Sequence, residues 1–308
     1  MATGVDLPVE GRLASFDAAA GWLNSPPLTP EELRGKVVLV DFWTYTCINW
    51  LRTLAWIRAW ADRYGDQGLV VVGVHTPEFP FERDADNVTR AVAEMGVRYP
   101  VALDPDYAVW DAFANRYWPA AYIADGEGQI RHHHFGEGAY DEQERVIQSL
   151  LGVDGELVSV EPAGFEVQAD WANLDSPETY LGSQQGVNPA PPGDLSLNQW
   201  SLEGDWSEEP RASVLDSGEG RLSFRFHARD AHLVMGPRER GAAVPFRVLL
   251  DGEAPGDAHG GDVDDDGRGT MSEQRLHQLI RQPGRIEDRT LELDFPEGGV
   301  EAYCFTFG

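Results

Sequence analysis

Apolar positions in the first half of the chain alternate between the spacing of strands and the spacing of helices. Residues 36–43 and 69–75 are short apolar runs rich in β-branched residues, which predicts two strands buried on both faces. Apolar residues from 47 to 64 recur at steps of three and four, which predicts an amphipathic helix that ends near Gly65. Further helices are predicted at 84–95, 104–115 and 140–151, and a hairpin of two strands at 120–124 and 129–135.

The second half of the chain has a different pattern. After Leu195 the helical spacing mostly disappears, and turn residues separate alternating runs at 221–226, 246–250, 290–295 and 301–307. This pattern predicts an antiparallel sandwich or jelly roll, with one short helix near 273–281. The sequence therefore predicts an α/β domain with a mixed sheet at 1–152, a partly ordered connector at 153–194 and an all-β domain at 195–308.

Charge and hydropathy limit the classes of partner. The chain carries 52 acidic and 24 basic residues, a formal net charge of −28. Such a charge repels phosphate backbones and anionic membranes, which argues against a nucleic-acid role. No stretch approaches the roughly 18 apolar residues of a membrane helix, and residues 1–10 lack the apolar core of a signal peptide. We therefore expect a cytoplasmic protein, or an extracytoplasmic one if a signal or membrane segment precedes this sequence.

Cys47 is the first candidate for chemistry. It stands where the strand predicted at 36–43 turns into the following helix. A helix N-terminus stabilises a thiolate, so this position favours a reactive thiol over an inert buried one. Cys304 is the second cysteine, and two cysteines exclude a disulfide framework. It lies in an alternating strand, where we expect a core residue; to resolve Cys47 it would need a Cα separation under about 7 Å.

Three motifs in residues 36–151 carry a resemblance. They are Asp41-Phe-Trp-Thr-Tyr-Thr-Cys47, Val74-His-Thr-Pro-Glu78 and Trp118-Pro119-Ala. With them the segment resembles the thioredoxin superfamily, and within it the TlpA/ResA-like redoxins. The resemblance implies that Asp41 is a buried acid that helps to deprotonate a second thiol and that Glu78 reaches the active site. It also implies that Trp118 precedes a cis-proline, Pro119, whose loop packs against the cysteine and holds the substrate backbone.

The resemblance extends over nearly the whole chain. The additional motifs resemble the soluble C-terminal region of DipZ-type proteins, in which a thioredoxin-like domain precedes a β-sandwich similar to carbohydrate-binding modules. A glycan partner is thereby implied, although Trp200 and Trp206 are expected in the core rather than on a sugar. The membrane segment of that family is missing here. The motifs are 42–49, 75–79, 115–119, 135–138, 176–182 and 302–308.

The chain departs from the family at position 50, where Trp50 replaces the second cysteine of Cys-x-x-Cys. Trp50 cannot resolve a mixed disulfide, and it begins the apolar stripe of its helix, so we expect it in the core. Three outcomes stay open. In the first, Cys47 acts alone and an external thiol, either a small reductant or a protein thiol, resolves its mixed disulfide. In the second, peroxide oxidises Cys47 to a sulfenic acid that another molecule reduces. In the third, the site is redox-silent and only binds a protein or glycan.

Two further residues bear on the peroxide alternative. Thr44-Tyr-Thr-Cys47 matches the Thr-x-x-Cys part of the peroxiredoxin signature, without its preceding proline. Arg116 is the candidate on sequence grounds for polarising a peroxide, against the alternative of an ordinary surface charge. None of these reactions requires a cofactor.

An acidic loop in the second half fits a calcium-binding pattern. Asp262, Asp264 and Asp266 precede Gly267, and Glu273 follows, as in D-x-D-x-D-G-x5-E. The preceding segment is not helical, so the loop is not an EF-hand. A calcium ion and a solvated, hydrogen-bonded turn are the two interpretations.

Overall fold

The computed structural model describes residues 7–308; residues 1–6, which carry much of the signal-peptide argument, lie outside the described residues. The chain divides into two compact units, one that ends at Glu166 and one that begins at Val167. The segment 153–194 is thus shared between the units. Among residues 7–308, no helix combines the length and the apolar character that crossing a membrane requires.

A mixed sheet forms the centre of the first unit. In its described residues seven strands follow the order β1-β7-β6-β3-β4-β5-β2, with β3 parallel to β4 and antiparallel to β6. All seven residues of β3 are buried, as predicted for a strand covered on both faces. The strands are β1 (Gly11–Arg12), β2 (Gly21–Leu23), β3 (Val37–Trp43), β4 (Leu69–His75), β5 (Val101–Leu103), β6 (Ala120–Ala124) and β7 (Gln129–Phe135).

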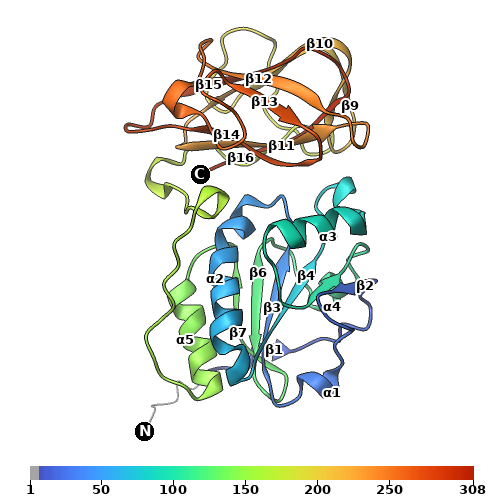
Figure 1. The fold of residues 1–308 in the computed structure, drawn as a ribbon, viewed down its shortest axis with the longest axis vertical. Coiled ribbons are helices and arrows are strands. Elements are labelled where there is room, and N and C mark those ends of the chain that lie inside the picture. The colour runs from blue at the N-terminus through green and yellow to red at the C-terminus, as the bar shows by residue number, and fades with distance from the viewer. Residues whose placement is uncertain (1–6) are drawn as a thin grey trace. The chain divides into compact units, whose positions relative to one another are not determined.

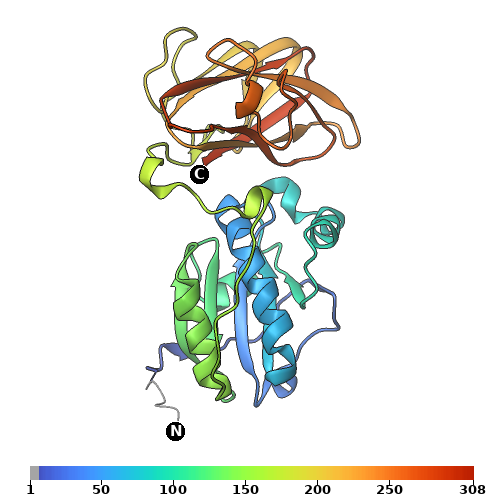
Figure 2. The same cartoon turned by 60° about the vertical axis from the view of Figure 1, so that its left-hand side comes forward.

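Helices cover this sheet. α2 and α5 lie side by side on one face (Figures 1 and 2), and Glu144 of α5 accepts hydrogen bonds from Trp60 and Tyr64 of α2. The helix predicted at 104–115 is shorter, because Tyr107 has a left-handed φ of 63° and helical geometry begins only after it. The helices are α1 (Pro30–Leu33), α2 (Ile48–Tyr64), α3 (Ala85–Glu94), α4 (Ala108–Ala112) and α5 (Tyr140–Leu151).

The second unit is an all-β domain, as predicted. Its described residues form a nine-stranded antiparallel sheet that curls around an apolar core (Figure 1). Its main path is β13-β12-β15-β10-β16-β11-β14, with β8 added to β16 and β9 added to β10. The strands are β8 (Thr179–Tyr180), β9 (Trp200–Glu208), β10 (Ser213–Phe226), β11 (Asp230–Pro237), β12 (Val244–Leu250), β13 (Arg268–Met271), β14 (Arg275–Arg281), β15 (Arg289–Phe295) and β16 (Val300–Phe307).

The helix predicted near 273–281 is wrong, because that segment is strand β14 and pairs with β11. Leu276, Leu279 and Ile280 have the spacing of one face of a helix. All five interior residues of β14 are buried, so the polar and apolar alternation of a half-exposed strand is lost. Pairing with a strand distant in sequence decides the structure here.

Candidate active site

Cys47 is the N-cap residue of α2, a helix of 17 residues. Its backbone N–H donates to the carbonyl of Thr44 at 3.3 Å, and its carbonyl accepts from the N–H of Leu51 at 3.0 Å. Its side chain is 8% exposed. The predicted strand-to-helix position is confirmed, and it places the thiol at the positive end of the helix dipole. That position lowers the energy of a thiolate relative to the thiol.

Trp50 fills the position of the missing second thiol. It is fully buried, and its ring stacks on Trp43 with centroids 4.2 Å apart. Its Nε1 donates to Oδ2 of Asp41 at 2.9 Å. Gly73 leaves room for this stack, since a Cβ there would lie 2.8 Å from Nε1 of Trp43. The prediction that Trp50 is a core residue is confirmed.

Asp41 is the buried acid behind the thiol turn. Burial raises its pKa to about 7, and the hydrogen bond from Trp50 opposes that rise. The resemblance to the thioredoxin superfamily implies that a carboxyl group in this position helps to deprotonate a second thiol. Here the indole of Trp50 occupies it, so Asp41 and Trp50 form a buried polar pair rather than a proton relay.

The Trp118–Pro119 peptide bond is cis, as predicted. The carbonyl of Pro119 accepts from the N–H of Gly136 at 2.8 Å, and Nε1 of Trp118 donates to the carbonyl of Thr76 at 3.1 Å. Phe42 at the end of β3 pairs with Ala120, directly after the cis bond. The Pro119 loop therefore lies at the end of the sheet from which the chain runs to Cys47.

Two threonines hold the turn between β3 and α2. Oγ1 of Thr46 donates to Oε1 of Glu82 at 2.6 Å, and Oγ1 of Thr44 lies 3.5 Å from Nε2 of His75. Burial raises the pKa of Glu82, and hydrogen bonds from Thr44 and Thr46 oppose the rise. Burial lowers the pKa of His75 to about 3, so this imidazole is neutral at physiological pH.

Glu78, the acid expected at the site, is half-buried, and its backbone N–H donates to Oε2 of Glu82 at 2.7 Å. The buried carboxylate bonded to the turn is thus that of Glu82, which sequence reasoning missed. A local signal for it existed: Pro80 opens a short 3-10 helix, and an acid two residues later can accept from the N–H groups that directly precede the helix.

Arg116, the arginine suggested for peroxide, is exposed on the surface. The buried arginine of this region is Arg52, five residues after Cys47, and its Nη1 lies 2.9 Å from Oε1 of Glu137. Glu137 follows Gly136, which is bonded to the Pro119 loop. The pattern of the sequence did not single out Arg52, because a charge within an amphipathic helix is ordinarily solvated.

Two candidates of the second unit lie in its interior. Cys304 of β16 is buried, and its thiol donates to the carbonyl of Phe305 at 3.4 Å. This confirms the expectation of a core cysteine. Trp200 is also buried, as expected, and its Nε1 donates to the carbonyl of Val187 at 2.8 Å. Its ring is therefore packed rather than presented to a sugar.

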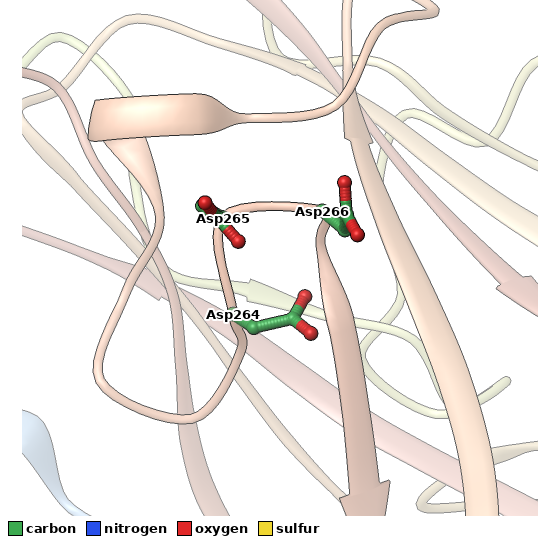
Figure 3. Close-up of side chains that lie close together, drawn as sticks. All are labelled: Asp264, Asp265 and Asp266. Atoms are coloured by element: carbon green, nitrogen blue, oxygen red, sulfur yellow. The ribbon is translucent and has the colours of Figure 1, made fainter.

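The acidic loop brings together a different set of carboxylates from the predicted one. In the described residues the carboxylates of Asp264, Asp265 and Asp266 come within 4.8 Å of one another, and all three residues are exposed (Figure 3). Asp262 instead accepts from Nη2 of Arg275 at 2.6 Å. Glu273 lies 3.7 Å from the same guanidinium. The two interpretations of the loop, a calcium site and a solvated, hydrogen-bonded turn, both stay predictions.

Comparison with known proteins finds two family profiles in this chain. A profile of the AhpC/TSA family matches residues 17–133, and a profile of the thioredoxin-like C-terminal domain matches residues 176–308. The thiol-disulfide oxidoreductase YkuV of Bacillus subtilis is 34% identical over 131 residues, which cover 42% of this chain and 87% of YkuV. The chain belongs to the thioredoxin-like redoxins. This redoxin is also similar to protein DipZ of Mycobacterium tuberculosis, with 33% identity over 316 residues and 97% of the chain.

The redoxin spans 43% of the length of DipZ, so it corresponds to less than half of that relative. The solution structure of a thioredoxin-like protein in the oxidized form aligns with 47% of this chain and 98% of its own, at 30% identity and a TM-score of 0.43.

Proposed function

We propose that this redoxin carries out thiol–disulfide exchange with Cys47 as its single nucleophilic thiol. The observation that carries the proposal is the pairing at the start of α2: a thiol at the helix N-terminus, and three residues later a buried Trp50 bonded to Asp41. The first supplies a nucleophile, and the second removes the internal resolving step. A thiol from another molecule must then complete the reaction.

The reaction balances in two steps. The Cys47 thiolate attacks one sulfur of a disulfide, a new S–S bond forms to Cys47, and the other sulfur leaves as a thiolate that takes a proton from water. An external thiolate then attacks the mixed disulfide, and Cys47 is released as a thiolate. The external thiol becomes joined to the substrate sulfur, so the pair of electrons comes from outside the chain.

A protein thiol or disulfide is the partner class that the surface supports. Tyr117 is 52% and Phe135 is 41% exposed, and their ring centroids lie 4.9 Å apart. They flank the Pro119 loop, because Tyr117 precedes the cis bond by one residue and Phe135 pairs with Ala120. An exposed aromatic pair beside the reacting end of the sheet suits an apolar side chain of a polypeptide. The relative YkuV is a thiol-disulfide oxidoreductase.

Peroxide reduction is a second candidate, supported by the AhpC/TSA match and by the Thr44-x-x-Cys47 spacing. In that reaction the thiolate attacks the O–O bond, Cys47 becomes a sulfenic acid and an alcohol or water leaves. Two external thiols would then return Cys47 to the thiol, forming a disulfide and water.

Alkylation of Cys47 as a function of pH tests whether the thiol is activated. We expect a midpoint below the ordinary cysteine value of about 8.5, and a trapped mixed disulfide when a protein disulfide is added. Cys47→Ser should abolish both signals, and Cys304→Ser, which changes a buried thiol of the second unit, should leave them in place. A midpoint at or above the ordinary value, with neither mixed disulfide nor sulfenic acid, would favour the redox-silent binding alternative.

The partner class has its own test. Combined Tyr117→Ala and Phe135→Ala should slow mixed-disulfide formation with a protein disulfide several-fold while leaving the reaction with a small aromatic disulfide unchanged. Equal slowing for both substrates would show that the pair supports the fold of the site and does not contact polypeptide.

A further inference from the structure

The turn that carries Cys47 is hydrogen-bonded to a buried carboxylate. Glu82 lies in a 3-10 helix (Pro80–Arg83) and is 1% exposed. Its Oε1 accepts from the hydroxyl of Thr46 at 2.6 Å. Its Oε2 accepts from the backbone N–H groups of Glu78 and Phe79 at 2.7 and 2.8 Å. One side chain thus joins the residue next to Cys47 to the loop that follows β4.

These contacts present the carboxyl group with hydrogen-bond donors. Two are fixed backbone N–H groups, and the hydroxyls of Thr46 and Thr44 add to them. Such donors stabilise the ionised form, whereas burial works against it and raises the pKa of Glu82. These donors can serve a carboxylate, and the carboxyl group is bonded to the residue directly before Cys47.

We infer that Glu82 is an acidic positioning residue of the Cys47 site: it fixes the 44–47 turn through Thr46 and, in its ionised form, sets a negative charge against the residue that precedes the thiol. The inference rests on the proposed function only in taking Cys47 as the reacting group. A neighbouring negative charge disfavours a thiolate, so Glu82 opposes the helix N-terminus of α2 and restrains the reactivity of the thiol.

Other buried charged or titratable groups reach this end of the sheet from each neighbouring element. They contact partners of their own: Asp41 accepts from Trp50, His75 faces Thr44, Arg52 pairs with Glu137, and Asp104 accepts from Thr76. On the 3-10 helix itself, the exposed Arg83 pairs with Asp106. Glu82 is the carboxylate whose contact is with Thr46, the residue directly before Cys47.

Glu82→Gln separates charge from shape. The amide oxygen can accept from the two N–H groups, and the amide nitrogen can donate to Thr46, because a hydroxyl both donates and accepts. The network is kept and the negative charge is lost. We expect the alkylation midpoint of Cys47 to fall by about one pH unit, which makes alkylation at about pH 6 roughly tenfold faster. Glu94→Gln, the same change at an exposed acid of α3, is the matched control and should leave the midpoint unchanged.

Thr46→Val provides a second variant if Glu82→Gln does not fold, as judged by circular dichroism. Loss of the hydroxyl removes a donor to Oε1 and favours the neutral acid, so the Cys47 midpoint should again fall, by less than in Glu82→Gln. Thr46→Ser keeps a hydroxyl and should retain the wild-type midpoint. A purely structural role would lower the melting temperature in both series without moving the midpoint.

The outcomes separate the inference from the proposed function. A folded Glu82→Gln variant with the wild-type midpoint overturns the inference, and so does an identical midpoint in Thr46→Val and Thr46→Ser. The proposed function is judged from the wild-type midpoint and the mixed disulfide alone. A high wild-type midpoint with neither mixed disulfide nor sulfenic acid, which still falls in Glu82→Gln, would retain the inference and reject the proposed function.

Discussion

An indole in place of a thiol at position 50 changes the role of the acid behind it. Asp41 accepts a hydrogen bond from Trp50, and the Trp50 ring stacks on Trp43 at the end of β3. The buried volume of the missing thiol is thus filled by a residue that also satisfies the carboxylate. Satisfying a buried polar group avoids a cost of about 1–3 kcal/mol. The ring of Trp50 is packed against Trp43, and its hydrogen bond to Asp41 fixes its orientation.

Trp50→Cys should restore a dithiol site at the cost of stability. A thiol at this position would face Asp41, the acceptor that Trp50 now uses, and would lie one helical turn from Cys47. We expect the variant to reduce insulin with a dithiol reductant, and to lose about 3–5 kcal/mol of unfolding free energy through the cavity. The double variant Trp50→Cys, Cys47→Ser should be inactive. A folded single variant without insulin reduction would mean that the rest of the site does not support dithiol exchange.

Asp41→Asn should change how stability depends on pH. Burial raises the pKa of Asp41 from 3.8 to about 7, so the folded state binds this proton more tightly than the unfolded chain does. The wild-type contribution is therefore fully present below about pH 4 and is lost as pH rises to about 7. Asn keeps an acceptor for Trp50 without ionising, so we expect the variant to be more stable than wild type at neutral pH, by at most on the order of 4 kcal/mol.

Urea unfolding at several pH values measures this difference. Asp62→Asn, a change of an exposed acid on α2, is the control and should follow the wild-type curve. Parallel curves for Asp41→Asn and wild type would contradict the argument that Asp41 titrates inside the fold.

Helix α2 carries Cys47 at its N-cap. Side chains near both of its ends make hydrogen bonds or ion pairs with other parts of the first unit. Near its start, Arg52 pairs with Glu137 in the loop after β7. Near its end, Trp60 and Tyr64 donate to Glu144 of α5. A helix held at both ends keeps its N-terminus, and so Cys47, in a constant position relative to the Pro119 loop. Precise positioning of this kind is what nucleophilic chemistry requires.

Arg52→Ala should destabilise the first unit strongly. It leaves the carboxylate of Glu137, whose side chain is 7% exposed, without its guanidinium partner. Removing one member of a buried ion pair costs about 3–5 kcal/mol. Thermal melts should show this loss, whereas Arg116→Ala, a change of an exposed arginine, should stay within about 0.5 kcal/mol of wild type. Equal effects of the two substitutions would refute the distinction between them.

For the whole molecule, two units with separate cores share a chain of formal charge −28. In the second unit, two arginines form ion pairs with the acidic loop that fits the calcium pattern. Arg275 pairs with Asp262, and Arg268 pairs with Asp266. The ion pairs lower the net charge that a cation would meet, and Asp262 is held away from the exposed group of three aspartates.

Calcium should therefore leave the melting temperature of the protein unchanged. A ligand that binds only the folded state stabilises it in proportion to the logarithm of its concentration over Kd. Differential scanning calorimetry with calcium, with magnesium as the matched control cation, checks this. A rise of the melting temperature with calcium and not with magnesium would establish the site, and Asp264→Asn should then abolish the rise.

Much of the fold and part of the site followed from local pattern. Apolar spacing alone predicted the bounds of β4 and α5, and the turn into α2 placed Cys47 at a helix N-terminus. The same reasoning failed for β14, where both faces are buried and the spacing of Leu276, Leu279 and Ile280 imitates a helix. Periodicity reports which positions are buried, and it distinguishes a strand from a helix only when one face stays exposed.

What the sequence determined by itself was the type and order of most elements and the place of Cys47 at a helix N-terminus, because each depends on residues adjacent in the chain. The cis-proline loop followed from the family resemblance. Only the tertiary structure decided which polar groups meet. Asp41 bonds Trp50, Thr46 bonds Glu82, and Arg52 rather than Arg116 is buried, against Glu137. These partners lie on different elements, and burial forces each polar group to find a donor or acceptor wherever the packing places one.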